Sequence, residues 1–529
     1  MLTQADYIIV GAGSSGCVLA AELSRDPAVT VALVESGPPD TSFLIDMPRG
    51  IGKLLTPGDP HCWQYEVNKG GNRPNEIWLK GRTLGGSSSI NGMIYTRGHP
   101  DDYDGWVAGG CPGWGWKDML PCFLAIEDHQ LGASPMRGSG GPLKVTVQPS
   151  TELSRAVVEA GVQAGLHRTQ DVNSELGDCI GSPPRTIYRG ARQSAAKAFV
   201  RPAKSRPNLH VMTDTDVVRI IFEGRRAVGV ELSDKAGARV LRSRSEVICA
   251  AGALESPRLL QLSGIGPGKL LQGLNIDVVS DLPNVGKNLR DHMGISTTYR
   301  VRGGSLNQEF QGLRLLWNVL RYFALKSGPM SIAASEYYGL FRSDPRLTRP
   351  DCQIMGGLYT MARTEKGLIL EKEPGLTISG FYLHPDSQGD IAIRSPDWRA
   401  PPSINANYLA TERDRAATLA MVKFYRQVAS QPALKPFIVG ELLPGPQVTG
   451  DEDLLQDIVD RGLTAFHAAG TCRMGSDSGA VVDPQLRVRG VDGLRVCDTS
   501  IFPELPASNT NAPAMAAGLR AAQIIRDAR

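Results

Sequence analysis

The stretch 6-DYIIVGAGSSGCVLAAELSRDPAVTVALVES-36 decides the fold of this chain. Residues 7–10 form a short apolar run of the kind found in a buried parallel strand. Three glycines follow in the spacing G-x-G-x-x-G, and then come an apolar helical segment over residues 18–23 and a second strand over 30–34. That strand ends at Glu35. Strand, glycine turn, helix, strand and terminal acid in this order predict a βαβ dinucleotide-binding unit.

Each glycine of this unit has a physical role. Gly11 makes the tight turn, Gly13 lets the backbone approach a pyrophosphate, and Gly16 lets the helix pack on the strand. The helix N-terminus offers free N–H groups and a positive dipole end to a diphosphate. Glu35 is placed to accept hydrogen bonds from ribose hydroxyls. The motif alone does not choose between FAD and NAD, although its position near the N-terminus favours a flavoprotein. The residues predicted to hold the cofactor here are Gly11, Gly13, Ser14, Ser15, Gly16 and Glu35.

The composition is that of a large globular protein. The chain has 529 residues, of which 41% are hydrophobic and 21% charged, and this predicts at least two domains. A net charge of +3 gives no reason to expect nucleic acid as a partner. No window approaches ~20 uninterrupted apolar residues, so we expect no transmembrane segment, and the first residues lack the pattern of a cleaved signal. Nine scattered cysteines without a C-x-x-C spacing predict a cytoplasmic protein with no zinc site, and peripheral attachment to a membrane stays open.

Two longer motifs extend the pattern. The first is GRTLGGSSSINGMIYTRGHPDDYD at 81–104, and the second is GALESPRLLQLSGIG at 252–266. Taken singly, the first could be a flexible loop and the second another βα unit. Together and in this order they resemble the two signatures of the glucose–methanol–choline (GMC) oxidoreductase family. The resemblance continues through NVGKNLRDH at 284–292, residues 389–409 and residues 467–526, so it covers nearly the whole chain.

The resemblance implies an α/β fold and a flavoprotein that oxidises an alcohol. Family members bind FAD in a Rossmann-like domain built from discontinuous segments. A second domain, a large and mostly antiparallel sheet flanked by helices, covers the flavin. We assign residues 1–150, 206–295 and 459–529 to the FAD-binding domain, and residues 151–205 and 296–458 to the substrate domain. Some members attach FAD covalently through a histidine where this chain has Ile90, so we expect non-covalent FAD. A monomer and a dimer are both compatible with the sequence.

The stretch TAFHAAGTCRMG at 464–475 carries His467, which matches the catalytic histidine of the family. A neutral imidazole can take the hydroxyl proton of an alcohol while hydride leaves the carbon for flavin N5. The family has a second catalytic residue, histidine or asparagine, just before the last helix. We assign it to Asn511, whose amide could orient the alcohol oxygen. Ala465 and Phe466 are expected beside the substrate, although Phe466 could equally be a core aromatic.

Further cofactor contacts follow from the resemblance alone. The first signature is expected to approach the phosphates at one end and the isoalloxazine at the other. Val217 matches a backbone contact to adenine, and Asp498 matches an acid at the ribityl or phosphate region. The residues so assigned are Thr83, Leu84, Ser88, Asn91, Gly92, Met93, Ile94, Val217, Asp498, Asn511 and Ala512.

Other interpretations remain open at the level of the residues. His467 lies five positions before Cys472, so a Cys–His nucleophile, a metal ligand and a satisfied buried histidine are alternatives. The remaining seven histidines are interpreted as structural. We predict oxidation of a primary alcohol with transfer of electrons to a quinone or another carrier. The alternatives are an oxidase that uses O2, a hydroxynitrile lyase-type protein with non-redox FAD, an inert FAD-binding scaffold and a pyridine-nucleotide enzyme.

Overall fold

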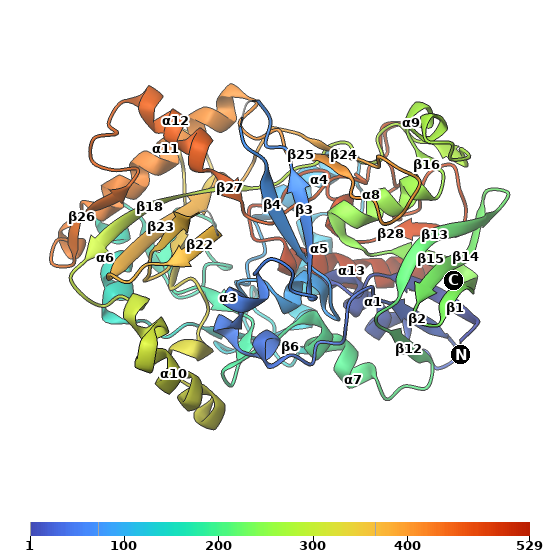
Figure 1. The fold of residues 1–529 in the computed structure, drawn as a ribbon, viewed down its shortest axis with the longest axis horizontal. Helices are drawn as coiled ribbons and strands as arrows, with labels where there is room; N and C mark the ends of the chain where they lie inside the picture. The colour runs from blue at the N-terminus through green and yellow to red at the C-terminus, as the bar shows by residue number, and fades with distance from the viewer. Residues whose placement is uncertain (1, 72, 365–366, 529) are drawn as a thin grey trace.

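The computed structural model describes residues 2–71, 73–364 and 367–528 and contains two large sheets side by side (Figure 1). The first sheet has the order β12-β2-β1-β15-β14-β13, with β28 paired to β15. The strands β12, β2, β1, β15 and β28 pair in parallel, whereas β14 and β13 add antiparallel ribbons. Its strands are β1 (Gln4–Val10), β2 (Val31–Val34), β12 (Leu209–Met212), β13 (Asp216–Glu223), β14 (Arg226–Asp234), β15 (Gly237–Cys249) and β28 (Leu494–Val496).

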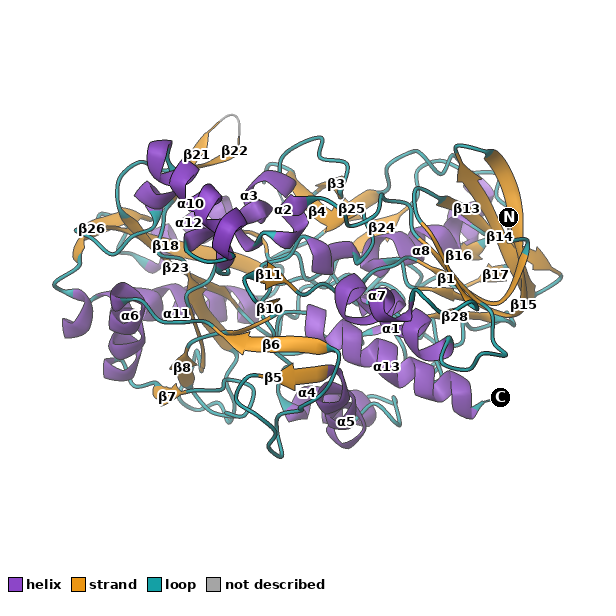
Figure 2. Ribbon diagram, turned by 90° about the horizontal axis from the view of Figure 1, so that it is seen from below, coloured by secondary structure: helices purple, strands orange, loops and turns teal. Residues whose placement is uncertain are grey.

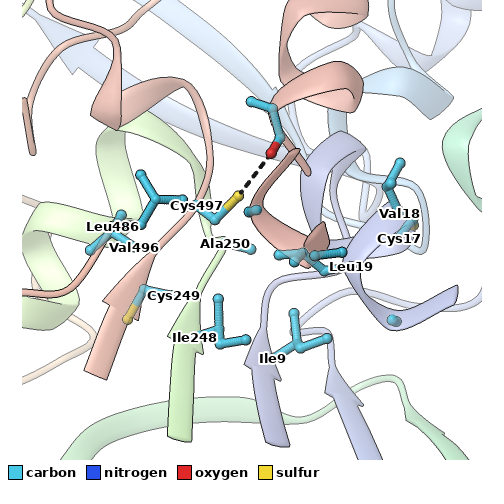
Figure 3. Close-up of a cluster of buried hydrophobic side chains, with 14 of the residues drawn as sticks. Ile9, Cys17, Val18, Leu19, Ile248, Cys249, Ala250, Leu486, Val496 and Cys497 are labelled. Carbon is cyan, nitrogen blue, oxygen red and sulfur yellow. Dashed lines mark hydrogen bonds between the residues drawn. The ribbon is translucent and has the colours of Figure 1, made fainter. Parts of the chain in front are cut away.

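The core of the first sheet forms where its parallel strands are apolar and buried, over residues 7–10 of β1, 31–34 of β2 and 247–249 of β15. Ile9 and Ile248 lie opposite each other on β1 and β15, and Val496 lies on β28 (Figure 3). The helices α1 (Ser14–Leu23) and α13 (Asn511–Asp527) pack together against this sheet (Figure 2). Their close approach requires Gly518, because a Cβ there would lie 2.8 Å from the carbonyl oxygen of Ser15.

The second sheet has the order β26-β18-β23-β20-β19-β8-β7, with β27 paired to β18. Its pairs are antiparallel except β7 with β8. The helices α6 (Glu152–Gln163) and α11 (Glu412–Ala429) contact this sheet and each other. Its strands are β7 (His167–Thr169), β8 (Cys179–Gly181), β18 (Met293–Val301), β19 (Tyr337–Phe341), β20 (Cys352–Gly356), β23 (Gly375–Phe381), β26 (Ile438–Leu443) and β27 (Leu463–Thr464).

Smaller elements surround the two sheets. The segment over α2, η1 and α3 and the ribbon β3–β4 lie between the sheets (Figure 1). No helix in the described ranges is long and apolar enough to cross a bilayer. The bounds are α2 (Phe43–Asp46), η1 (Pro48–Gly50), α3 (Ile51–Leu54), β3 (Cys62–Val67), β4 (Glu76–Gly81), α4 (Pro100–Ala108), α5 (Trp116–Ile126), β5 (Glu127–His129), β6 (Leu143–Val147), α7 (Arg201–Ala203), α8 (Gly252–Leu262), α9 (Gly268–Gly273), α10 (Gly312–Leu325), η5 (Pro329–Ser331), β24 (Asp390–Ala392), β25 (Ser403–Asn405) and α12 (Asp451–Arg461).

The predicted α/β fold is confirmed, with differences in detail. The first helix begins at Ser14, directly after the glycine turn, rather than at residue 18. Residues 390–392 form β24, which pairs with β25 outside the large sheet. The strand β27 joins the second sheet, although its residues fall in the segments predicted for the FAD-binding domain. The division into two domains at those residue numbers stays a prediction.

Candidate active site

A cavity of about 410 Å³ lies where the carboxyl ends of the parallel strands of the first sheet face the second sheet. Gly11 follows β1, Glu35 follows β2, Ala250 follows β15 and Asp498 lies just after β28, and all four line the cavity. Met355 of β20 lines it from the second sheet. Ligands of open α/β sheets bind at such carboxyl edges, so this cavity is the candidate site.

The glycine turn leaves room for a diphosphate at the N-terminus of α1. Gly11 has φ of +99°, and a Cβ there would lie 2.5 Å from the carbonyl oxygen of Ala250. A Cβ at Gly16 would lie 2.0 Å from the oxygen of Gly11, so both glycines are required for packing. Gly13 differs, because it lines the cavity and its Cβ would meet no atom closer than 3.9 Å. A side chain at Gly13 would therefore fill the cavity itself, beside Ser14 and Ser15.

Glu35 holds the shape of this turn as well as lining the cavity. Its Oε2 accepts from the backbone N–H of Ala12 at 3.0 Å, and its Oε1 accepts from Gly37 at 3.0 Å. Burial raises the pKa of Glu35 to about 7, against the two backbone hydrogen bonds, which lower it. Each carboxylate oxygen keeps a second acceptor position, so Glu35 retains the capacity to bind a ribose hydroxyl.

The first signature reaches the cavity at Gly81, at Gly86 and Ser87, and along residues 90–94. Asn91, Gly92, Met93 and Ile94 line the cavity, and their contact with the isoalloxazine stays a prediction. Asn91 fixes this turn, because its Oδ1 accepts from the backbone N–H of Met93 and, at 2.8 Å, from the buried guanidinium of Arg192. Met93 itself has φ of +64°. The turn thereby holds four successive residues against the cavity.

The predicted contacts of Thr83, Leu84 and Ser88 need correction. Thr83 is buried and donates its hydroxyl to Pro38 O at 2.8 Å, and Leu84 packs against the core of the first sheet. The Ser88 hydroxyl donates to Gly85 O and accepts from Ala195 N–H. These side chains support the loop from behind, and Ser87 lines the cavity instead. Ala512 is likewise buried in α13 rather than in the wall.

Val217 and Asp498 both line the cavity. Asp498 is buried and accepts from the backbone N–H of Gly252 at 2.8 Å and from the hydroxyl of Ser256 at 2.5 Å. Burial raises its pKa, while the hydrogen bonds from Ser256 and Ser500 lower it. Asp498 therefore ties the N-terminus of α8 to the end of β28, where both border the cavity.

His467 and Asn509 meet in the wall of the cavity. The imidazole Nε2 lies 3.2 Å from the amide Nδ2 of Asn509. The predicted partner Asn511 is directed elsewhere, because its Oδ1 accepts from the Ser14 hydroxyl at 2.7 Å. The assignment of Asn511 beside His467 was therefore wrong. Thr510, the N-cap of α13, separates the two asparagines, and only the first faces the histidine.

A second histidine, which the sequence left as structural, lies behind His467. The Nδ1 atoms of His292 and His467 are 3.1 Å apart, and His292 Nε2 lies 3.0 Å from Leu383 O. His292 stacks on Phe381 with ring centroids 4.4 Å apart. Its position in NVGKNLRDH was the available sequence signal, although no spacing in the sequence connects it with His467.

The hydrogen bonds determine the tautomer of His467. A carbonyl oxygen only accepts, so neutral His292 donates through Nε2 to Leu383 and accepts at Nδ1. His467 then donates through its Nδ1, so its Nε2 is unprotonated and can accept a hydrogen bond. The amide orientation of Asn509 agrees, because its Oδ1 accepts from the Thr96 hydroxyl and leaves Nδ2 to donate to His467. The proton acceptor of His467 is thus directed at the cavity.

The backbone around His467 is held by a buried carboxylate. Asp291 Oδ1 accepts from the His467 N–H at 2.7 Å, and its Oδ2 accepts from the Thr464 hydroxyl at 2.6 Å. Phe466 adopts φ of +64° and is 40% exposed. It lines the cavity with Ala465 rather than belonging to the core. Lys80 of β4 donates to Phe466 O at 2.7 Å.

The electrostatic surroundings keep His467 neutral. Burial lowers the pKa of His467 well below its usual value, and the neighbouring His292 and the Lys80 ammonium lower it further. Burial also lowers the pKa of His292, to about 3. Both imidazoles are therefore uncharged at neutral pH, as the hydrogen-bond chain requires.

Cys472 is not a partner of His467. Its backbone N–H donates to Ser500 O at 2.8 Å, and burial raises the pKa of its thiol well above the usual value. A buried thiol without a base is a poor nucleophile. All nine cysteines are free and buried. The described residues contain no cluster of three or more histidine, cysteine, aspartate or glutamate side chains able to hold a metal ion.

The residues present fit FAD. The open space at Gly13, the helix N-terminus at Ser14 and the free acceptors of Glu35 suit the diphosphate and a ribose. The N-terminus of α13, at Thr510 and Asn511, borders the same cavity next to His467. It presents a positive dipole end where a reduced flavin would gain negative charge. Ile90 lines the cavity, so the histidine that could bond covalently there is missing.

Comparison with known proteins identifies close similarity over the full length. The model described as GMC oxidoreductase matches residues 5–294 with its N-terminal part and 385–518 with its C-terminal part. An alcohol dehydrogenase (acceptor) of Pseudomonas putida is 38% identical, over 98% of this chain and 95% of its own length. The mitochondrial choline dehydrogenase of Homo sapiens is also 38% identical, over 98% of this chain and 89% of its own.

Solved structures show the same architecture. Pyridoxine 4-oxidase from Mesorbium loti has a TM-score of 0.89 at 31% identity, with 99% of each chain covered. A formate oxidase has a TM-score of 0.92 at 26% identity, over 100% of this chain and 99% of the oxidase. The similarity therefore extends over both sheets.

Proposed function

The chain belongs to the GMC oxidoreductase family and is an FAD-dependent oxidoreductase of alcohols. From this premise we propose that His467 is the general base and that the substrate is an uncharged primary alcohol. The observation that carries the proposal is the unprotonated Nε2 of His467, which borders the cavity and accepts from the amide of Asn509. An unionised imidazole in this position can accept a hydroxyl proton directly.

The residues of the chain divide the reaction between them. FAD, when bound, supplies the acceptor for the hydride that leaves the alcohol carbon. The alcohol hydroxyl donates to His467 Nε2, and the Asn509 amide turns its N–H to the alcohol oxygen and orients it. His467 then carries the proton and a positive charge. Its Nδ1–H bond to neutral His292 becomes charge-assisted and therefore stronger, which stabilises the cation in a buried site.

The charge of the site favours a neutral substrate. Lys80 lines the cavity and lies close enough to lower the pKa of His467, so a cationic group there would be repelled. The carboxylates among the described lining residues are Glu35, Glu255 and Asp498, and each already accepts a hydrogen bond from another residue of the protein. The apolar side chains that line the cavity include Met93, Ile94, Met355, Ala465 and Phe466.

The test is anaerobic bleaching of the enzyme-bound flavin by single alcohols, which presupposes no electron acceptor. We expect bleaching by uncharged primary alcohols such as alkanols or benzyl alcohol, and at least ~10-fold weaker reduction by choline at equal concentration. The variant His467→Ala should reduce the flavin at least ~10²-fold more slowly. Equal or faster reduction by choline would refute the charge argument, and an unchanged rate in His467→Ala would refute the base. Cyanide release from mandelonitrile without bleaching would indicate lyase chemistry instead.

We further propose that the electrons pass to a quinone-type or other carrier rather than to O2. The support is the alcohol dehydrogenase of Pseudomonas putida, 38% identical, whose name specifies an acceptor; relatives named oxygen-dependent choline dehydrogenase are 36–39% identical, so the experiment and not the identity decides between the acceptors. Reduced enzyme mixed with air-saturated buffer in a stopped-flow instrument should reoxidise slowly, whereas a soluble quinone should reoxidise it quickly. Fast reoxidation by O2 would favour the oxidase alternative.

A further inference from the structure

The helix α10 exposes an apolar face that no described part of the chain covers. Leu313, Leu316, Trp317, Leu320 and Phe323 are spaced as one helical face and are all exposed, with Leu313 at 84% and Trp317 at 66%. Single exposed leucines are ordinary on protein surfaces, but a contiguous face of this kind marks an interaction site. The helix projects from the body of the molecule (Figure 1).

The opposite face of α10 attaches the helix firmly. Tyr322 is buried in a small cluster with Met47 and Met330, and Leu315 and Val319 pack against it. Asn318 donates to Glu309 O at 2.9 Å. The helix is therefore a fixed part of the fold, and its apolar outer face is not a consequence of fraying. Phe43 of α2 extends this face, because it is 55% exposed and lies 5.5 Å from the Phe323 ring.

Basic side chains border the apolar face. Arg314, Arg321 and Lys326 are exposed, and Lys326 holds its ammonium 4.3 Å from the centroid of the Tyr322 ring. From Glu309 to Lys326 the segment carries one acidic and three basic residues, which is a net charge of +2. An apolar face with tryptophan and leucine, edged by arginine and lysine, is the pattern of a helix that lies in a membrane interface.

We propose that α10, together with Phe43, docks this protein on the surface of a lipid bilayer that contains anionic lipids. The apolar face would enter the boundary between headgroups and acyl chains, and Arg314, Arg321 and Lys326 would pair with anionic headgroups. A second copy of the chain fits this face less well. In a symmetric dimer each face meets itself, so the basic residues of the two copies would be brought together.

The docking face is connected to the candidate active site. Met47 lies four residues before Ile51, and Met330 lies four residues before Ala334, and both Ile51 and Ala334 line the cavity. A docked molecule would thus hold this side of the cavity next to the bilayer. The docking itself does not depend on the proposed substrate or on the identity of the base.

The test uses the full holoprotein and sucrose-loaded vesicles of phosphatidylcholine alone or with one-third phosphatidylglycerol. Sedimentation should show binding to the anionic vesicles that weakens with added salt. The double variant Leu316→Glu with Leu320→Glu should lower the partition coefficient at least ~10-fold, because it places two charges in the apolar face. Val240→Glu is the control for a charge placed at an exposed apolar side chain elsewhere, since Val240 is 44% exposed on β15 of the first sheet. This variant should bind vesicles like the wild type.

Fluorescence and oligomeric state distinguish the alternatives. Vesicles should shift the tryptophan emission to shorter wavelength, and Trp317→Phe should remove most of the shift while the protein still sediments with vesicles. Replacing Arg314, Arg321 and Lys326 together by glutamine should remove the preference for anionic vesicles. The proposal is overturned if the wild type does not sediment with anionic vesicles, if the Leu316/Leu320 variant binds equally, or if that variant only converts a dimer into a monomer in analytical ultracentrifugation.

Discussion

Asn509 and Asn511 lie two positions apart, yet the structure directs one to His467 and the other to Ser14. We expect Asn509→Ala to slow alcohol-driven flavin reduction about 10²-fold, because a hydrogen-bond donor at the reacting oxygen is lost. Asn511→Ala should instead weaken FAD retention, since Ser14 loses its acceptor at the diphosphate turn. Single-turnover bleaching and FAD content after gel filtration measure the two effects. If Asn511→Ala instead slowed flavin reduction and Asn509→Ala left its rate unchanged, the assignment made from the sequence would be restored.

The depressed pKa of His467 predicts a shifted pH profile. The base acts when it is neutral, which is the case above its pKa, and burial, His292 and Lys80 hold that pKa well below 6.5. The limiting rate of flavin reduction should therefore stay flat from pH 9 to about 6.5 and fall only at lower pH. In Lys80→Met one lowering charge is absent, so the acidic limb should move to higher pH. A wild-type limb centred at pH 7 or above would contradict the neutral histidine pair.

At the scale of the secondary-structure elements, the turn between β1 and α1 separates folding from cofactor binding. Gly13 has φ of −78°, which any residue adopts, and its missing side chain only keeps the cavity open. We expect Gly13→Val to fold but to bind FAD roughly 5- to 150-fold more weakly, from an overpacking cost of about 1–3 kcal/mol.

The matched comparison is Gly11→Val. Gly11 has φ of +99° and no room for a Cβ, so this variant should lose thermal stability even without the cofactor. Equal melting temperatures for the two apoproteins, or full FAD occupancy in Gly13→Val, would show that the turn does not separate the two roles.

At the scale of the whole molecule, the cavity is shared by both sheets, since Gly11, Glu35 and Asp498 come from the first and Met355 from the second. Bound FAD should therefore stabilise the two halves together. Adding FAD to the apoprotein at 100 times its Kd should raise the unfolding free energy by about 2.7 kcal/mol. Calorimetry should show one transition for the holoprotein. If FAD shifts only one of two separate transitions, it is held by one half alone.

The sequence by itself determined the fold class and the cofactor site in outline. The order of apolar strand, three glycines, helix and Glu35 is local, because each residue acts through neighbours a few positions away, and such patterns are readable along the chain. The same holds for Asn91 to Ile94 and for His467, whose motifs are continuous. Thr83, Leu84 and Ser88 were misplaced because a loop has a cavity side and a supporting side that its sequence does not distinguish.

The tertiary structure alone decided which side chains meet. His292 and His467 are 175 positions apart, and Asn509 is 42 positions from His467, so their contacts exist only where β18, the loop after β27 and the start of α13 converge. Helical geometry turned Asn511 toward α1 and left Asn509, just before the helix, facing the histidine. The tautomer that leaves His467 Nε2 unprotonated likewise depends on the carbonyl of Leu383, in another segment. Long-range packing fixes these relations, and no local pattern carries them.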